Sequence, residues 1–242
     1  MVVIGITGKK GAGKTYLASQ IVATYGGIIL NFAQPLKLLS YKYFGIYLTK
    51  DKQLILEKFG KLEENFKLNS HISKVIVENI IKNSNQLSHL ISKINDYAEL
   101  LPSLYKIIVN YYSSKEEKER DKYARIWLQM FGTDLVRNLI DKDYWVNELK
   151  EAINKIEKET NIVVIDDVRF INEFAFIKSF DKHITIAVKY EEDYSDTHQS
   201  EIEMETFIDK CDFTIERKST LGNYIQQLRD IFEKIKKLLA KA

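Results

Sequence analysis

A glycine-rich loop near the N-terminus carries the clearest chemical signal in the sequence. Residues 8–15 read G-K-K-G-A-G-K-T and match the pattern G-x-x-x-x-G-K-[ST] at every fixed position. Glycines let successive backbone N–H groups turn toward one anion, and Lys14 adds a full positive charge for the β- and γ-phosphates. The loop therefore predicts a nucleoside triphosphate site with Mg²⁺, the metal being held by the hydroxyl of Thr15. The residues predicted to bind ATP are Gly8, Lys9, Lys10, Gly11, Ala12, Gly13, Lys14, Thr15 and Tyr16.

A second cluster follows an apolar run later in the chain. Residues 162–170 read I-V-V-I-D-D-V-R-F, an expected buried strand that ends in two carboxylates and an arginine. Ligands of open α/β sheets bind at the carboxyl ends of the strands, so this cluster is expected at the same edge as the glycine-rich loop. There Asp167 can hold Mg²⁺, partly through water, and Arg169 can bind a phosphate through two N–H groups. A plain salt bridge between Asp167 and Arg169 is the alternative.

A third unusual segment is residues 123–134, Y-A-R-I-W-L-Q-M-F-G-T-D. Arg125 and Gln129 are four residues apart, which places them on one face of a helix. A guanidinium for a phosphate and an amide for the edge of a base would form a monophosphate site. The alternative is a surface ion pair beside a solvated glutamine, on a helix that otherwise belongs to the core.

The elements that must position these residues alternate between strands and helices. Apolar runs predict strands at 2–7, 28–32, 162–166, 183–188 and 212–215, and helical spacing predicts helices at 16–25, 145–159 and 221–239. This alternation predicts an α/β fold with a five-stranded parallel sheet flanked by helices. Apolar residues from 51 to 140 recur at helical spacing, including Ile72, Val75, Leu87 and Leu90. The expected division is a core of residues 1–44 and 141–242 with a helical lobe, 45–140, inserted.

Composition excludes several classes. The 242 residues contain 36 Lys and Arg against 34 Asp and Glu, a net charge of +2 that does not favour a nucleic-acid partner. The single cysteine, Cys211, excludes an intramolecular disulfide framework and a cysteine-rich metal site. No apolar run reaches the roughly 18 residues of a membrane helix. We therefore expect a cytoplasmic protein with no membrane partner, and the helical lobe offers a surface for a homodimer.

Together the motifs resemble the deoxynucleoside monophosphate kinases of bacteriophages and related viruses. The strings that carry the resemblance occur in order as 8–15, F-A-Q-P-L-K at 32–37, 125–134, D-Y-W-V at 143–146, D-V-R-F-I-N-E at 167–173 and H-Q-S-E at 198–201. The resemblance implies a P-loop kinase core, a helical monophosphate-binding lobe and a lid at about 190–205. It implies transfer of the γ-phosphoryl group of ATP to a small-molecule acceptor, a dNMP, giving dNDP and ADP, in a host cytoplasm if the protein is viral.

The resemblance also assigns residues to the reaction. Arg169 and Arg125 would grip the α-phosphate of the acceptor, and Asp167 would organise Mg²⁺ and these arginines. Trp145 or Phe32 would stack on the base. The implied catalytic residues are Lys14, Arg125, Asp167 and Arg169, the implied metal ligands are Thr15 and Asp167, and the implied dNMP-binding residues are Phe32, Lys37, Arg125, Gln129, Asp134, Trp145, Arg169 and Glu173.

Three features depart from the expected pattern. Thr15 directly follows the loop lysine, where many members of the family have Asp-Thr. Lys189 stands where the family often has a lid arginine, and residues 191–205 hold seven acidic residues and no basic one. Ser200 and Glu203 fit a capping box that opens a helix, and His198 fits a structural role. Two other classes stay open: another P-loop small-molecule kinase, acting on dephospho-coenzyme A or a nucleoside, and a P-loop ATPase that is not a kinase.

Overall fold

Five strands form one parallel sheet in the computed structural model, which describes residues 1–59, 101–190, 198–217 and 220–240. The strand order is β2-β3-β1-β4-β5, and each neighbouring pair is parallel. This confirms the predicted α/β sheet with flanking helices. The strands are β1 (Val2–Thr7), β2 (Ile28–Leu30), β3 (Ile162–Val168), β4 (His183–Lys189) and β5 (Phe213–Glu216).

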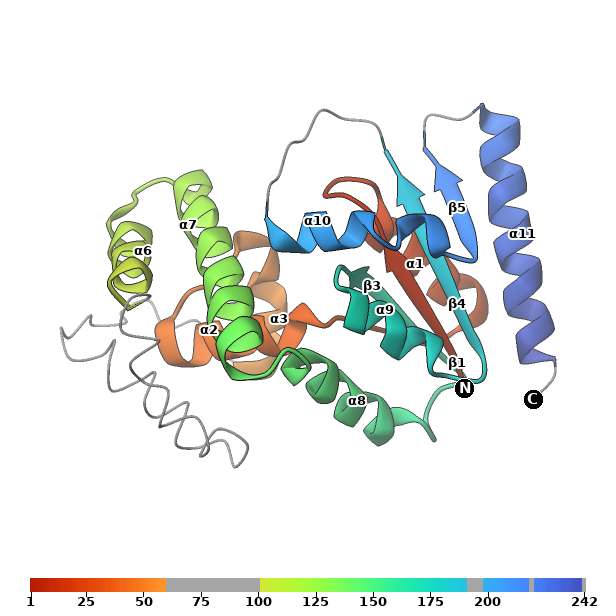
Figure 1. Cartoon of the computed structure of the whole chain (residues 1–242), viewed down its shortest axis with the longest axis horizontal. Coiled ribbons are helices and arrows are strands. Elements are labelled where there is room, and N and C mark those ends of the chain that lie inside the picture. The colour runs from red at the N-terminus through yellow and green to blue at the C-terminus, as the bar shows by residue number, and fades with distance from the viewer. Residues whose placement is uncertain (60–100, 191–197, 218–219, 241–242) are drawn as a thin grey trace. The chain divides into compact units, whose positions relative to one another are not determined.

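The helices connect these strands and build a separate helical region (Figure 1). The described helical elements are α1 (Lys14–Tyr25), α2 (Ala33–Phe44), η1 (Thr49–Asp51), α3 (Lys52–Phe59), α6 (Leu101–Ser113), α7 (Glu117–Gln129), the π-helix η3 (Met130–Ile140), α8 (Tyr144–Ile156), α9 (Ile171–Lys178), α10 (Gln199–Glu205), η4 (Ile208–Lys210) and α11 (Leu221–Leu239). Among them, no helix is both long and apolar enough to cross a membrane.

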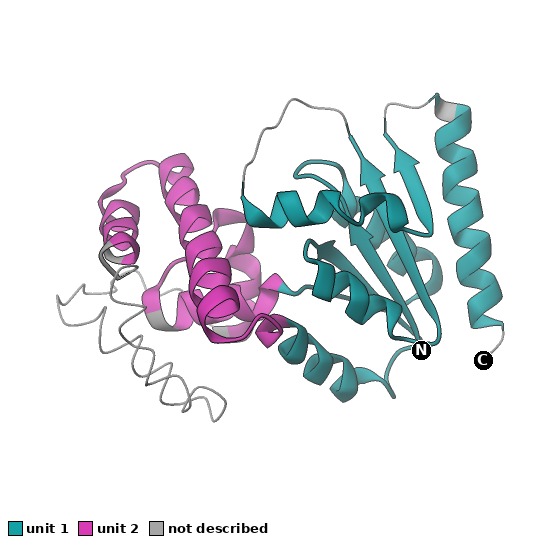
Figure 2. Cartoon of the chain, viewed as in Figure 1, with its two compact units in different colours: residues 1–32, 146–242 teal, residues 33–145 magenta. Residues whose placement is uncertain are grey.

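The chain divides into two compact units (Figure 2). The first, which we call the sheet unit, comprises residues 1–32 and 146–242, and the second, the helical unit, comprises residues 33–145. The predicted lobe begins at residue 45, whereas α2 already lies in the helical unit. The reason is its apolar face: Leu36 and Phe44 pack with Trp127 and Phe131 in that unit's own core.

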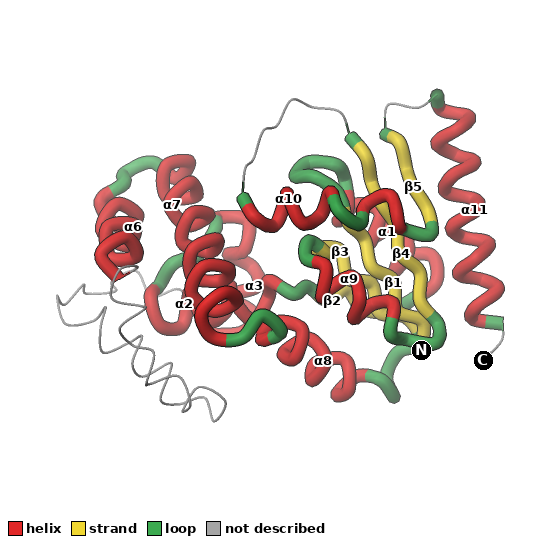
Figure 3. The backbone as a smooth tube through the Cα atoms, viewed as in Figure 1, coloured by secondary structure: helices red, strands yellow, loops and turns green. Residues whose placement is uncertain are grey.

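The sheet unit has helices on both faces of the sheet (Figure 3). On one face, Ile4 and Ile6 of β1 pack with α1 and α11, and on the other, Val3 packs with α8 and α9. Alternate strand residues thus serve two cores, as expected of a sheet covered on both sides. A Cβ on Gly5 would lie 2.9 Å from Cγ1 of Ile177 in α9, so glycine allows the close packing of strand and helix.

The helical unit is organised around an aromatic cluster. Trp127 stacks on Phe131, with ring centroids 5.4 Å apart and planes 10° apart, and its indole N–H donates to Oγ of Ser40 at 3.1 Å. Gly132 allows Leu36 to approach, because a Cβ there would lie 2.5 Å from Cδ2 of the leucine. The apolar pattern predicted at 72–94 lies outside the described residues.

Candidate functional site

The glycine-rich loop adopts the conformation that its sequence predicts. Gly8, Gly11 and Gly13 all have positive φ angles, of 143°, 80° and 96°, which residues with a Cβ rarely adopt. Gly13 is the N-cap of α1, so the loop leads directly into the positive end of a helix dipole. The helix begins at Lys14, two residues before the predicted start. Thr15 and Tyr16 are exposed in its first turn.

Lys14 turns back over the loop. Its Nζ donates to the carbonyl oxygen of Gly8 at 2.5 Å and to that of Lys9 at 2.8 Å. Burial, followed by the nearby positive charge of Arg169, lowers the pKa of Lys14 to about 8, and negative charges on Glu201, Asp166 and Asp167 oppose this shift. The electrostatic coupling means that the loop lysine shares one environment with the cluster at the end of β3. The sequence prediction that both lie at one edge of the sheet is consistent with this coupling.

The end of β3 is tied to its neighbours by hydrogen bonds. Thr7 donates to the carbonyl oxygen of Val168 at 2.8 Å, which joins the ends of β1 and β3. Asn31 donates to Asp166, whose side chain is buried, and the backbone N–H of Phe32 donates to Asp167 at 2.9 Å. Both carboxylates are therefore held in place at the carboxyl ends of the strands, where ligands of such sheets bind.

Arg169 is held at its backbone and at its side chain. Its backbone N–H donates to Oε2 of Glu173 at 2.7 Å, and the N–H of Phe170 donates to the same oxygen at 3.1 Å. The guanidinium forms an ion pair with Glu201 of α10. Glu173, predicted to bind the acceptor, is a buried residue that caps α9. The structure thus pairs Arg169 with Glu201, rather than with Asp167 as the alternative interpretation proposed.

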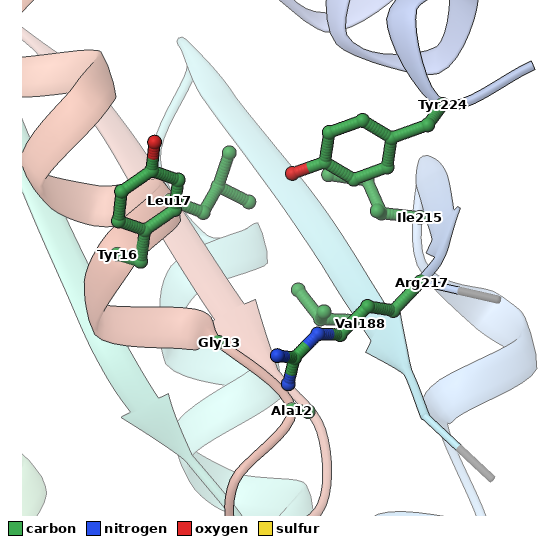
Figure 4. Close-up of a pocket in the computed structure, with 8 residues that line it drawn as sticks. All are labelled: Ala12, Gly13, Tyr16, Leu17, Val188, Ile215, Arg217 and Tyr224. Carbon is green, nitrogen blue, oxygen red and sulfur yellow. The ribbon is translucent and has the colours of Figure 1, made fainter. Parts of the chain in front are cut away.

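A pocket of about 530 Å³ opens beside the glycine-rich loop. Tyr16 of α1 and Tyr224 of α11 project toward it from different sides, and the guanidinium of Arg217 lies beside the loop (Figure 4). Arg217 donates to the carbonyl oxygen of Gly11 at 2.7 Å and lies over the ring of Tyr190, 4.6 Å from its centroid. A group attached to phosphates on the loop would find two aromatic rings and one cation here. The pocket is lined by Ala12, Gly13, Tyr16, Leu17, Val188, Ile215, Arg217 and Tyr224.

In the helical unit, Arg125 and Gln129 lie on α7, both half-buried. Among the described residues, neither side chain has a hydrogen-bond or ion-pair partner. A surface ion pair, the alternative interpretation for Arg125, is therefore not found in the described part of the chain. A half-buried guanidinium that has no counter-ion in the described part of the chain is suited to an anionic ligand.

Other predicted residues of the helical unit have partners within it. Nζ of Lys37 lies 3.0 Å from Oδ1 of Asp51. Trp145 is buried, and its indole N–H donates to the carbonyl oxygen of Gly132 at 3.0 Å. Asp134 is half-buried and also has an interaction partner. Trp145 is thus a core residue that fixes the backbone near the start of η3.

Phe32 does not have the role predicted for it either. Its side chain is 2% exposed and packs edge-to-face on Phe176 of α9, with ring centroids 6.3 Å apart. The ring has no face open for stacking on a base, because Phe32 is part of the core of the sheet unit. Its backbone N–H instead anchors Asp167.

Of the segment predicted as a lid, about 190–205, the structure describes residue 190 and residues 198–205. Lys189, at the end of β4, forms an ion pair with Asp209 at 2.6 Å. A helix capped by Ser200 would begin at residue 201, but α10 begins two residues earlier: His198 is its N-cap, and Nδ1 of His198 accepts from the N–H of Ser200 at 3.2 Å. The structural role expected for His198 is consistent with this contact.

Comparison with known proteins gives the chain its family. The sequence profile described as "Deoxynucleotide monophosphate kinase" matches residues 2–228. The chain belongs to this family. A protein of Acanthamoeba polyphaga mimivirus, provisionally named a deoxynucleotide monophosphate kinase, is 25% identical over 243 residues, covering 94% of each sequence. The chain is therefore a kinase that uses a nucleotide and a small-molecule substrate, as the resemblance in the sequence implied.

Solved structures with a similar arrangement are more distant. A dephospho-CoA kinase from Campylobacter jejuni has a TM-score of 0.42 and 13% identity, with 97% of each chain covered. A protein from Thermus thermophilus has a TM-score of 0.39 and 11% identity, with 96% of this chain and 97% of that chain covered.

Three polar residues of the site were missed by the sequence interpretation. Asp166, Arg217 and Glu201 all contact or electrostatically influence the loop or Arg169. Asp166 and Arg217 lie at the carboxyl ends of β3 and β5. Because ligands of open α/β sheets bind at these ends, the position of each residue in the sequence could have indicated that it belongs to the site. Glu201 lies within H-Q-S-E, one of the strings that carry the family resemblance.

Proposed function

We propose that the chain transfers the γ-phosphoryl group of ATP to a deoxynucleoside monophosphate, with Mg²⁺, giving dNDP and ADP. The observation that carries the proposal is the phosphate loop, whose three glycines have positive φ angles and lead into α1, with Lys14 in the electrostatic neighbourhood of Arg169 beyond β3. One cation serves the phosphates of the donor, and the other serves the phosphate of the acceptor. Phosphoryl transfer needs such positioning of two anions and neutralisation of the charge between them.

The residues present fit a magnesium ion. Lys14 and Arg169 share their environment with the three carboxylates of Asp166, Asp167 and Glu201, so this cluster carries one formal negative charge in excess. Adding the phosphates of ATP to such a cluster calls for a further cation. Mg²⁺ binds through few protein ligands and keeps water and phosphate oxygens, which suits Thr15 and Asp167. When bound, it neutralises charge on the phosphates.

Groups of the chain itself bind and orient the two substrates. Backbone N–H groups of the loop and the ammonium of Lys14 hold the β- and γ-phosphates. Arg169 holds the acceptor phosphate, whose oxyanion attacks the γ-phosphorus, so no separate base is required. The base of ATP is proposed to occupy the pocket between Tyr16 and Tyr224, with Arg217 beside it. Stacking and the guanidinium would orient it there.

The helical unit is proposed to contribute to recognition of the acceptor. Arg125 has no protein counter-ion among the described residues, and Gln129 follows it by one helical turn. A phosphate for the arginine and a base edge for the amide are the ligands that these groups suit. We also propose that the helical unit can form a homodimer. The proposed location is the cytoplasm, and no nucleic-acid partner is proposed.

The direct experiment incubates the protein with ATP, Mg²⁺ and each dNMP and NMP in turn, and separates the nucleotides by chromatography. We expect a diphosphate from at least one dNMP. Lys14→Met should abolish it, whereas Lys158→Met, which removes an exposed lysine of the same unit, should leave the rate unchanged. Formation of no diphosphate from any monophosphate would refute the proposal.

A further inference from the structure

Glu201 is a buried carboxylate in a helix of seven residues whose other charges are less enclosed. Its side chain is 9% exposed, although it lies in the first turn of α10, where a glutamate that merely complements the helix dipole can remain in water. Burying a charge costs free energy unless the charge is paired, and an apolar side chain often stabilises such a position equally well. A carboxylate at this position therefore calls for an explanation beyond stability.

The partner of Glu201 is Arg169, 32 residues earlier in the chain. The contact joins Oε1 of the glutamate to one Nη1 of the arginine, whose side chain is 33% exposed. A guanidinium has five N–H donors. Glu201 thus holds one end of the group and leaves donors on the exposed part available for a second anion, so the carboxylate and a phosphate can share the arginine.

The backbone of Arg169 is fixed independently by Glu173. An arginine held at its backbone alone could point in several directions, because its side chain has many rotamers and their loss opposes binding. A second anchor at Nη1 selects one direction before any ligand arrives. Such preorganisation lowers the entropic cost of binding an anion.

We propose that Glu201 is a positioning residue that aims the guanidinium of Arg169 at the phosphate of the acceptor. This inference rests on the proposed function, in which Arg169 binds that phosphate. Glu201 touches neither nucleotide; it acts through the arginine. α10 thereby becomes part of the acceptor site even though its polar group faces a protein partner.

The test is a double-mutant cycle between Glu201→Gln and Arg169→Gln, with the acceptor KM and kcat measured at saturating ATP. Glu201→Gln should raise the acceptor KM by about tenfold, within the range for side chains coupled in one network. In the Arg169→Gln background the same change should alter the acceptor KM less than about twofold, because the group that Glu201 positions is gone.

Glu203→Gln is the matched control. It removes the same charge from the same helix, and Glu203 contacts Gln199 and the backbone of Ile171 instead of Arg169. We expect its acceptor KM to stay within about twofold of the wild type, as for a site that is not coupled. An equal rise for Glu203→Gln and Glu201→Gln would overturn the inference in favour of a general charge effect.

The outcomes also separate this inference from the proposed function. If Arg169→Gln raises the acceptor KM but Glu201→Gln does not, or if the effect of Glu201→Gln persists undiminished in the Arg169→Gln background, only the positioning role fails. If Arg169→Gln leaves the acceptor KM unchanged, the acceptor assignment fails first. Should Glu201→Gln not fold, the same cycle is made with Glu201→Asp, which keeps the charge and withdraws the carboxylate. A rise in acceptor KM that survives removal of Arg169 would again overturn the inference.

Discussion

Replacing Gly8 by alanine tests how tightly the sheet constrains the phosphate loop. Gly8 has a φ of 143°, and a Cβ at this position would overlap the carbonyl oxygen of Val188 at the end of β4. Two costs therefore combine: an unfavourable backbone angle and a steric overlap with another strand. Gly11, with a φ of 80° and open space around its Cα, carries the first cost without the second.

The magnitudes follow from this difference. An alanine in the left-handed region costs about 1–2 kcal/mol, which is the full expected effect of Gly11→Ala. At Gly8 the overlap adds about 1–3 kcal/mol, the usual cost of overpacking, so the total is about 2–5 kcal/mol. Gly222, in the first turn of α11, has neither problem, and Gly222→Ala should be neutral or stabilise the chain by up to about 1 kcal/mol.

The assay compares the three variants by thermal unfolding and by the KM for ATP. In a chain of this length, a loss of 1 kcal/mol lowers Tm by about 2–4 °C, so the expected order is resolvable. Gly8→Ala should also raise the KM for ATP most, because the loop can relieve the overlap only by moving its N–H groups away from the phosphates. A Gly8→Ala variant as stable and as active as Gly11→Ala would refute the reasoning about Val188.

Three further predictions concern single side chains. Arg125→Gln should raise the acceptor KM about tenfold and leave the KM for ATP unchanged, because one charge-assisted contact with the acceptor is lost. Steady-state kinetics with each substrate varied in turn would measure both constants. A raised KM for ATP with an unchanged acceptor KM would show that Arg125 serves the donor instead. Arg217→Met should raise the KM for ATP several-fold and leave the acceptor KM unchanged, because its contacts with Gly11 and the pocket are lost; an unchanged KM for ATP would exclude it from the donor site. Burial chiefly, with the adjacent charge of Asp212, raises the pKa of Cys211 to about 12, so its thiolate is scarce at pH 8. Native protein should thus react with a thiol reagent far more slowly than protein unfolded in urea, with a rate that climbs between pH 8 and 10; equal rates would contradict the burial of the thiol.

The fold was predictable because its strands are apolar on both sides. Runs such as 2–6 and 162–165 lack alternation, which indicates a strand covered by helices on both faces, and the structure places β1 and β3 there. The boundary after the second strand was less predictable. Phe32 fits an apolar strand equally well, but its side chain packs beneath α9, and the strand ends at Leu30.

The roles of site residues were predictable only where local geometry determines them. In the loop of residues 8–15, the glycines that determine the conformation and the lysine that binds phosphate are close together in the sequence. Its conformation could therefore be predicted from the sequence alone. Trp145 looked like a stacking partner, yet an aromatic ring with an N–H group is equally suited to a core with a nearby carbonyl oxygen. The pairing of Arg169 with Glu201 depends on how α10 packs on the sheet unit, which no local pattern encodes.

The strand order has a consequence for how this enzyme is made. β1 pairs with β3 and β4, so Val3 lies beside Val163 and His183, residues synthesised long after it. Contacts of such large sequence separation form slowly, and they require most of the chain to have left the ribosome. The helical unit, by contrast, is one continuous stretch, 33–145, with its own core. The phosphate-loop motif is therefore translated well before the strands beside which β1 lies, and a chain that stops before residue 162 would carry the complete phosphate-loop sequence without the strands that hold it in shape.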